Sequence, residues 1–231
     1  MISLVIITLN EEKHIGKLLE SIKNQSFQDY EVIVSDAGST DNTLKIAKEY
    51  GCRIVKGGPI PLGRNNGAKA AKGDILFFMD SDITLGKDFL KESVANFNRK
   101  KLDVAGVYMK ADSNHLMDRC YYSFLNLWFF VMQKVYPHVV GSCMISKREV
   151  FDKIGGFDTS IHITDDLDYA NRASKYFRFG LTGTNVSVSA RRFAKEGRLK
   201  MGIKYILIFF HRVFLGEIKD KKRFNYRFGI W

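Results

Sequence analysis

Two acidic side chains separated by one residue follow a strongly apolar run, and this pair could hold a metal ion. Asp80 and Asp82 flank Ser81 directly after Ile75-Leu76-Phe77-Phe78-Met79. Carboxylate oxygens are the ligands that Mg²⁺ and Mn²⁺ prefer, and these cations also bind phosphate oxygens. A D-x-D triplet is common in surface turns, but its place after an apolar strand favours a metal site here.

Polar residues also follow the first two apolar runs of the chain, at positions 2–7 and 31–35. In an open α/β sheet, ligands bind at the carboxyl ends of the strands. We therefore expect these side chains to line one crevice, where the Asp36 carboxylate could accept the imide N–H of a uracil ring. The alternative is that they only cap the helices that follow. Together with the first two residues of the D-x-D triplet, the side chains expected in this crevice are those of Thr8, Asn10, Glu11, Asp36, Asp80 and Ser81.

A basic residue in a glycine-bounded segment should reach the same crevice. Arg64 lies in Gly63-Arg64-Asn65-Asn66-Gly67, and a guanidinium suits a phosphate or a base edge. Gly58 and Gly63 have the spacing of a phosphate-binding loop, but Arg64 and Asn65 stand where that loop needs Lys and Ser or Thr. The sequence has no G-x-G-x-x-G after a strand-like run either. These patterns exclude a Walker-type ATPase and a NAD enzyme.

The elements that must position these residues alternate between strand-like and helical patterns. Residues 2–7, 31–35, 53–55 and 75–79 form apolar runs, and helical periodicity lies between them. This alternation predicts an α/β fold with a mainly parallel sheet that is covered on both faces. Further strands are expected at 104–109, 142–145 and 181–190, an aromatic helix at 116–136, and a helix capped by Thr164 that extends through 172–177.

In their order along the chain, these motifs resemble those of the inverting family 2 glycosyltransferases, over residues 3–192. The resemblance implies a GT-A fold, which is α/β with a Rossmann-like, mainly parallel sheet flanked by helices. It implies a GT-A domain at 1–192, with a nucleotide-binding half at 1–102 and an acceptor-binding half at 103–192. The remaining residues, 193–231, would form a basic, aromatic, helical tail.

The activity that the resemblance implies is transfer of a sugar from a nucleotide-diphosphate donor, a UDP- or GDP-sugar, with inversion. The acceptor would be a hydroxyl or a lipid phosphate, as in a saccharide or a polyprenyl phosphate. In the family, the turns matched by Asn10-Glu11-Glu12 and by Asp36 to Thr43 line the nucleoside pocket, and Arg64 matches a residue that contacts the nucleotide.

The resemblance also implies a metal centre and a diphosphate clamp. Asp82 matches the principal ligand of Mg²⁺ or Mn²⁺, and Asp80 is expected to contact the metal and the ribose. Arg191 and Arg192 lie in a segment similar to one that closes over the diphosphate, although a basic helix start is the alternative. Several relatives use a further histidine as a ligand, and none lies between His162 and His211.

A second acidic cluster matches the family's catalytic base. Asp165, Asp166 and Asp168 follow Gly155-Gly156-Phe157-Asp158, which is similar to the family's G-G-F-D/E turn. Asp166 stands in the base position, and Asp165 is the other residue that could fill it. A sugar hydroxyl is a weak nucleophile, so a positioned carboxylate must accept its proton. The alternative is a solvated first helical turn, where acids interact favourably with the helix dipole.

Charge is concentrated in the tail, and this favours an anionic partner. The chain carries a formal net charge of +11, and residues 191–231 hold +9 of it. Neither 120–133 nor 205–210 is long enough to cross a bilayer, which needs about 20 apolar residues. Aromatic and aliphatic residues beside Lys and Arg instead suit a helix on an anionic membrane surface, and core helices are the alternative. Membrane-surface residues are expected among Lys219, Lys221, Lys222, Arg223, Phe224, Tyr226, Phe228 and Trp231.

The remaining features suggest a cytoplasmic protein, peripheral on the inner face of the cell membrane. Three cysteines without C-x-x-C spacing indicate no disulfide framework, and the N-terminus has no signal-peptide pattern.

Two other functions compete with sugar transfer. A sugar-phosphate nucleotidyltransferase would carry a glycine-rich signature near its N-terminus. A nucleic-acid-binding protein would explain the basic tail, but acids in the crevice would repel a polyanion.

Overall fold

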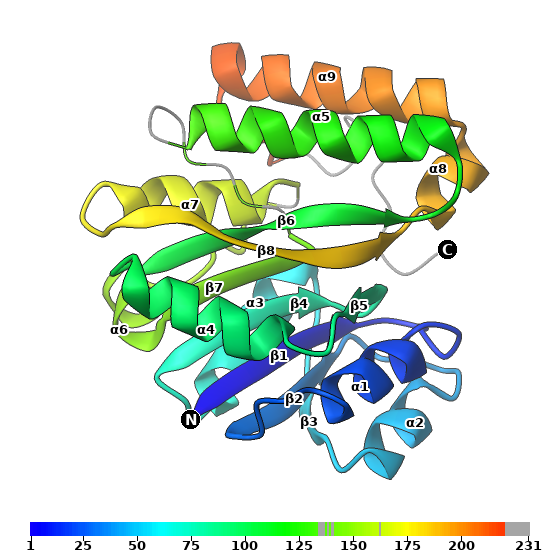
Figure 1. Ribbon diagram of the computed structural model, residues 1–231, viewed down its shortest axis with the longest axis vertical. Helices are drawn as coiled ribbons and strands as arrows, with labels where there is room; N and C mark the ends of the chain where they lie inside the picture. The colour runs from blue at the N-terminus through cyan, green and yellow to red at the C-terminus, as the bar shows by residue number, and fades with distance from the viewer. Residues whose placement is uncertain (134–136, 138, 140, 162, 220–231) are drawn as a thin grey trace.

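The computed structural model describes residues 1–133, 137, 139, 141–161 and 163–219 (Figure 1). Its strands are β1 (Ile2–Thr8), β2 (Tyr30–Asp36), β3 (Arg53–Lys56), β4 (Ile75–Asp80), β5 (Ile83–Leu85), β6 (Val104–Asp112), β7 (Cys143–Lys147) and β8 (Phe179–Ser189). Its helices are α1 (Ile15–Lys23), α2 (Thr43–Glu49), α3 (Ile60–Ala70), α4 (Phe89–Arg99), α5 (Leu116–Met132), α6 (Arg148–Lys153), α7 (Asp165–Ser174), α8 (Arg191–Glu196) and α9 (Arg198–Leu215).

The strands form one sheet in the order β3-β2-β1-β4-β7-β6-β8-β5. The first four neighbours are parallel, as expected, and their register aligns Thr8 with Asp36 and Ile7 with Asp80. The polar residues that follow these strands therefore lie at one edge of the sheet. From β4 onward the sheet is mixed, because β7 runs antiparallel to both β4 and β6, and β5 runs antiparallel to β8.

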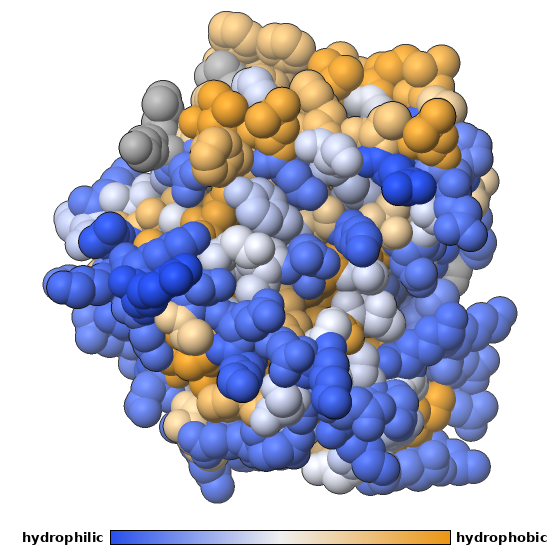
Figure 2. Space-filling view, in the orientation of Figure 1, coloured by the Kyte–Doolittle hydropathy of each residue, from blue (hydrophilic) through white to orange (hydrophobic). Residues whose placement is uncertain are grey.

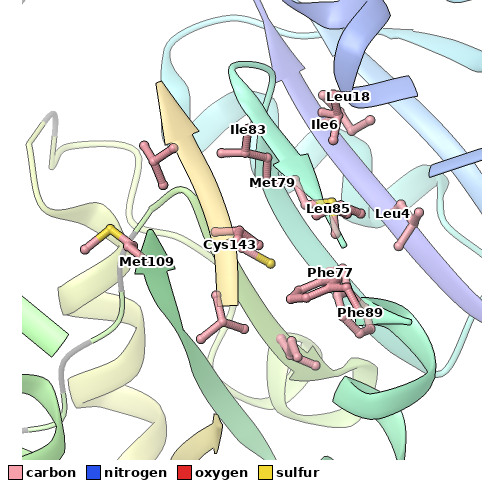
Figure 3. Close-up of a cluster of buried hydrophobic side chains, with 14 of the residues drawn as sticks. Leu4, Ile6, Leu18, Phe77, Met79, Ile83, Leu85, Phe89, Met109 and Cys143 are labelled. Atoms are coloured by element: carbon pink, nitrogen blue, oxygen red, sulfur yellow. The ribbon is translucent and has the colours of Figure 1, made fainter. Parts of the chain in front are cut away.

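Alternate residues of the central strands enter two apolar layers. Leu4 and Ile6 of β1 face one layer, together with Phe77 of β4 and Leu18 of α1 (Figure 3). Val5 faces the other layer, which is formed with residues of α3, α6 and α7. All seven residues of β1 are buried, as expected for a parallel strand covered on both faces. The sequence-based prediction of a Rossmann-like GT-A sheet flanked by helices is confirmed.

Several local predictions differ from the structure. Thr164 precedes α7, but its φ is 67° and its side chain makes no capping hydrogen bond, so the predicted cap is wrong. Arg64 lies inside α3, which starts after Pro59, ahead of the glycines. The aromatic helix α5 ends at Met132, and its predicted continuation to 136 falls outside the described residues.

The tail is helical up to Leu215, through α8 and α9. The proposed boundary after residue 192 falls within α8, and the division of the chain at 102 and 192 stays a prediction. The tail residues from Lys221 to Trp231 that were expected at a membrane lie outside the described residues. Across the ranges that the structure covers, no helix combines the length and the apolar character needed to cross a bilayer.

Candidate active site

The loops after β1 and β2 are joined into one unit by side-chain hydrogen bonds. Asn10 Oδ1 accepts from the Thr40 amide at 2.9 Å, and the Glu11 amide donates to Thr43 Oγ1 at 2.7 Å. Asn10 adopts a left-handed φ of 54°, which an asparagine tolerates better than most residues. The two loops therefore form a fixed wall at the edge of the parallel strands.

Asp36 is the centre of this wall rather than a free acceptor. Its Oδ1 accepts from Thr8 Oγ1 at 3.0 Å, and its Oδ2 accepts from the amides of Gly38 and Ser39 at 2.9 Å each. Gly38 has a φ of 100°, where a side chain would be strained. The carboxylate thus holds the turn open, and both of its oxygens already accept hydrogen bonds from the protein.

Arg64 links three segments that are far apart in the sequence. Its side chain is 4% exposed, and Nη1 donates to Asp165 Oδ2 at 2.7 Å. Nη2 donates to the Gly141 carbonyl at 2.9 Å and lies 3.4 Å from Asp80 Oδ1. The guanidinium also stands over the Phe157 ring, 5.4 Å from its centroid. One cation therefore fixes the end of β4, the segment before β7 and the start of α7.

Asp165 and Asp166 occupy different environments at the start of α7. Asp165 is 4% exposed and is held by Arg64. Burial raises the pKa of the Asp165 carboxyl, and the positive charge of Arg64 opposes that rise. Asp166 is half-buried, and its Oδ1 accepts from the Leu167 amide at 2.9 Å. Of the two acids, Asp166 is the one that a second molecule can reach.

The space between Asp166 and Arg64 is filled closely by backbone at Gly141. A Cβ atom at Gly141 would lie 2.8 Å from Arg64 Nη2 and 3.3 Å from Asp166 Oδ2. The charges of Asp82 and Asp166 both act on Asp80, so the D-x-D triplet and the predicted base share one electrostatic environment. Burial raises the pKa of Asp80, and Arg64 opposes that rise.

A second arginine joins the first loop to the D-x-D triplet. Arg191, at the start of α8, donates to both oxygens of Glu11, from Nη1 to Oε2 at 2.9 Å and from Nη2 to Oε1 at 2.6 Å. Its Nη2 also lies 3.2 Å from Asp82 Oδ2. Glu11 is 5% exposed, so this carboxylate positions Arg191 instead of facing solvent. Arg192 acts on Asp80 through its charge.

The D-x-D carboxylates fit a hard divalent cation. The side chains of Asp80 and Asp82 are 34% and 21% exposed, and Ser81 between them is buried. Among the described residues, no group of three or more His, Cys, Asp or Glu side chains could hold a metal ion. Mg²⁺ commonly keeps several waters and binds through one or two carboxylates plus substrate phosphates. Two carboxylates are therefore a sufficient protein contribution.

Sequence reasoning missed the contacts that hold this site together. Asn65 pairs with both backbone groups of Phe157, since Oδ1 accepts from the amide and Nδ2 donates to the carbonyl, each at 2.8 Å. A Cβ atom at Gly156 would lie 2.6 Å from Asn65 Oδ1. The Gly-Gly-Phe turn thus places Phe157 beneath Arg64. The only sequence signal for this pairing was the position of Asn65 beside Arg64.

Comparison with known proteins agrees with this geometry. The model of the family described as Glycosyl transferase family 2 matches residues 3–155. Poly(ribitol-phosphate) beta-N-acetylglucosaminyltransferase TarS of Staphylococcus aureus strain Mu50 is 35% identical over 119 residues. That match covers 47% of this chain and 21% of TarS, so the chain spans about a fifth of the length of this relative.

Two solved structures share the fold. TarS 1–349 of S. aureus in complex with UDP-GlcNAc superposes with a TM-score of 0.68 at 22% identity, over 81% of this chain and 58% of that one. Mannosyltransferase PcManGT from Pyrobaculum calidifontis, in complex with GDP-Man and Mn²⁺, gives 0.73 at 17% identity, over 95% and 65%.

The family model spans both the wall formed by the first two loops and the D-x-D triplet. Sugar transfer is therefore favoured over the competing nucleotidyltransferase and nucleic-acid-binding functions. With its GT-A sheet and its acids gathered at one edge, the chain belongs to glycosyl transferase family 2.

Proposed function

We propose that this chain is a glycosyltransferase that moves a sugar from a UDP- or GDP-sugar to a hydroxyl acceptor, with the help of Mg²⁺ or Mn²⁺ and with inversion at the anomeric carbon. The observation that carries the proposal is the position of Arg64, which contacts Asp80 at the donor end and Asp165 beside the predicted base. A donor bound at Asp80 and Asp82 would thereby lie next to Asp166.

The nucleoside would bind against the wall formed by the loops after β1 and β2. Thr8, Asn10 and Asp36 shape this wall through their mutual hydrogen bonds. Asp36 would contribute by holding the turn in its open conformation. The nucleobase would bind in the space that this turn leaves free. Asp80 and Ser81 are expected on the ribose side of the same pocket.

Charge on the diphosphate would be neutralised from two sides. Asp80 and Asp82 would hold the metal ion, which, when bound, stabilises the negative charge that develops on the departing nucleoside diphosphate. Arg191 and Arg192 would face the same phosphates from α8. Arg191 is pre-oriented for this task because Glu11 binds its guanidinium through two hydrogen bonds.

Asp166 is proposed as the base that accepts the proton of the attacking hydroxyl. Asp165 is buried and ion-paired with Arg64, so its proposed role is to position Arg64 and the start of α7. A single displacement, with the acceptor attacking opposite the leaving group, inverts the anomeric centre. The name of the relative TarS states a poly(ribitol-phosphate) acceptor, and ribitol units offer hydroxyls of the required kind.

The acceptor proposal can be tested with Asp166→Asn. A hydroxyl acceptor predicts a loss of transfer of about 10²–10⁴-fold, since the amide cannot accept the proton. Asp152→Asn, at an exposed position in α6, is the matched control and should keep full activity. If Asp166→Asn retains most activity, the acceptor is already ionised, as in a polyprenyl phosphate, and the hydroxyl proposal is wrong.

The donor and metal proposals can be tested by calorimetry. UDP and GDP are titrated into the protein with Mn²⁺, with Mg²⁺ and with a chelator. We expect one of the two nucleotides to bind in the presence of a divalent ion, and Asp82→Asn to remove the metal-dependent part of the affinity. Equal affinity in chelator would contradict the metal proposal, and absence of binding by either nucleotide would contradict the donor proposal.

A further inference from the structure

A large apolar surface lies away from the candidate active site, on helices α5 and α9. Thirteen of the seventeen large hydrophobic side chains that are exposed among the described residues belong to these two helices. They gather at one end of the molecule, where Figure 2 shows a nearly continuous hydrophobic area over α5 and α9. Exposed apolar patches of this extent mark interaction sites in soluble domains. We refer to the outer face of α5 and α9 as the two-helix platform.

The exposed residues repeat at helical spacing on each helix. On α5 they include Phe124, Leu127 and Val131, which are 63%, 62% and 61% exposed. On α9 they include Ile203 and Phe210, each 51% exposed. Spacings of three and four residues place side chains on one face of a helix. Each helix therefore presents a solvent-facing apolar stripe in addition to the face that it packs inward.

The two helices lie side by side and run in the same direction. Asp118 binds Arg198 at 2.8 Å near their first turns. Further along, the ring centroids of Tyr121 and Tyr205 are 6.2 Å apart, and those of Trp128 and Phe209 are 5.4 Å apart. These aromatic contacts fill the seam between the helices. The platform is thus a pair of packed helices, of which α9, with eighteen residues at 1.5 Å per residue, is about 27 Å long.

The charges of the platform select its partner. Asp118 is the only acid within α5 and α9, and it is buried and paired with Arg198. The exposed charges at the first turns of the two helices are basic, Arg119 on α5 and Lys200 on α9. Lys195, at the end of α8, is also exposed and precedes α9. An apolar face bordered by exposed cations and free of exposed acids is complementary to an anionic lipid surface. A second copy of the chain would present the same cations without acids to pair them.

We propose that the two-helix platform docks on an anionic membrane surface, with α5 and α9 lying in the interface and Arg119, Lys195 and Lys200 among the head groups. The platform is connected directly to the candidate active site through α8. The ring of Phe193 on α8 packs against those of Tyr121 and Tyr205, with centroid distances of 4.9 Å and 6.4 Å. Arg191 at the start of the same helix binds Glu11. Docking would therefore present the active site to an acceptor carried in the lipid layer.

The proposal is independent of catalysis and is tested with the full chain and vesicles alone. Partition of the protein is measured by flotation with neutral phosphatidylcholine vesicles and with vesicles that also contain phosphatidylglycerol. We expect strong partition only with the anionic vesicles. The double variant Phe124→Ser/Phe210→Ser should lower partition by about 100-fold, because it removes two side chains from the interface. Tyr176→Ser, at a position 76% exposed outside the platform, is the matched control.

A charge variant distinguishes electrostatic binding to anionic lipid from nonspecific hydrophobic adsorption. Arg119→Ser/Lys200→Ser should lower partition on anionic vesicles by about tenfold, and Lys69→Ser/Lys91→Ser, an equal change of charge at exposed positions elsewhere, should have little effect. A fluorophore on Cys120, which is exposed on α5, should report a less polar environment on vesicle addition. Burial raises the pKa of Cys52 to about 11 and also raises that of Cys143, so Cys120 is the thiol that reacts.

Three results would overturn the proposal: no partition on anionic vesicles, equal partition of the platform variants and their controls, or a stable dimer that the platform variants convert to monomer without any vesicle binding. Circular dichroism of each variant checks the fold. Nucleotide binding by calorimetry is measured in parallel, so a failure of the platform proposal is distinguished from a failure of the proposed function.

Discussion

The candidate active site and the helix pair α5 and α9 differ in where they place polar and apolar side chains. In the candidate active site, polar side chains are buried and have partners. Asp36, Glu11 and Asp165 are each less than a tenth exposed, and each is held by hydrogen bonds or an ion pair. On α5 and α9, apolar side chains are exposed in two stripes. The polar groups of the first region have their partners within the protein. The apolar side chains of the second region stay in contact with solvent until a partner covers them.

This contrast follows from the cost of leaving a group without its preferred surroundings. A buried carboxylate without partners is strongly unfavourable, so the buried acids of the candidate site must have their partners before any ligand arrives. An exposed apolar side chain costs far less in the free protein, and it can stay exposed until a partner binds. Matched substitutions in the two regions should therefore differ in their effects.

The largest effect is expected from Arg64→Met. Removing this cation leaves Asp165 buried without its ion-pair partner, and breaking a buried pair in this way costs about 3–5 kcal/mol of unfolding free energy. Urea denaturation of the variant and the parent protein measures the difference. The double variant Arg64→Met/Asp165→Leu should recover much of the loss, since it removes the uncompensated charge. A loss of less than about 1 kcal/mol would show that the contact of Arg64 with Asp165 contributes little to stability.

The Arg64→Met variant should also differ from the parent protein in how its unfolding free energy depends on pH. Burial raises the pKa of Asp165 in the folded protein, and without Arg64 the positive charge that most strongly opposes this rise is lost. The folded state then binds more protons than the unfolded state, so the stability of the variant should fall as the pH increases from about 4 to about 7. The parent protein should show a smaller slope over the same range.

The second prediction compares two phenylalanines. Phe78 is fully buried and packs against Phe157 with a centroid distance of 4.9 Å, whereas Phe124 is 63% exposed on α5. Phe78→Ala should lower the unfolding free energy by about 3–5 kcal/mol, because it leaves a cavity. Phe124→Ala should change it by no more than about 0.5 kcal/mol. A comparable loss at Phe124 in the free protein would mean that α5 is part of the core.

The sequence was sufficient to predict the parallel half of the sheet and the edge at which the acids meet. Apolar runs of strand length followed by polar residues at Thr8, Asp36 and Asp80 determined both features. Local patterns carry this information because the burial of a strand and the position of its end both depend on the types of consecutive residues. The order of the antiparallel strands depends instead on pairings between distant segments, such as β4 with β7.

The partners of the acids were not predictable in the same way. Glu11 and Arg191 are 180 residues apart in the chain, and Arg64 and Asp165 are 101 apart. No spacing rule relates residues at such separations. The sequence assigned Glu11 and Asp36 to the nucleotide, and the structure shows both engaged with protein groups, so direct contact of either residue with the donor stays a prediction.

The third prediction addresses the link between the two regions. Glu11→Gln removes the charge that binds Arg191 and keeps one acceptor oxygen, so we expect a loss of about 1–2 kcal/mol of unfolding free energy. Amide hydrogen exchange should become faster in α8, where Arg191 lies, and stay unchanged in α1. Glu49→Gln, at an exposed position at the end of α2, is the control. Unchanged exchange in α8 would show that Glu11 does not hold that helix.

Two glycines test packing in the two regions, and their effects should differ in sign, with the smaller effect expected at Gly202. At Gly67 in α3, a Cβ atom would lie 2.3 Å from Val5 Cγ1, so Gly67→Ala forces α3 away from β1 and should cost about 1–3 kcal/mol. At Gly202 in α9, a Cβ atom would meet nothing within 4 Å. Gly202→Ala should therefore stabilise the protein by about 0.5–1 kcal/mol, because alanine loses less conformational freedom in a helix. Thermal unfolding of both variants measures the difference, and a destabilising Gly202→Ala would mean that the outer side of α9 is already covered in the free protein.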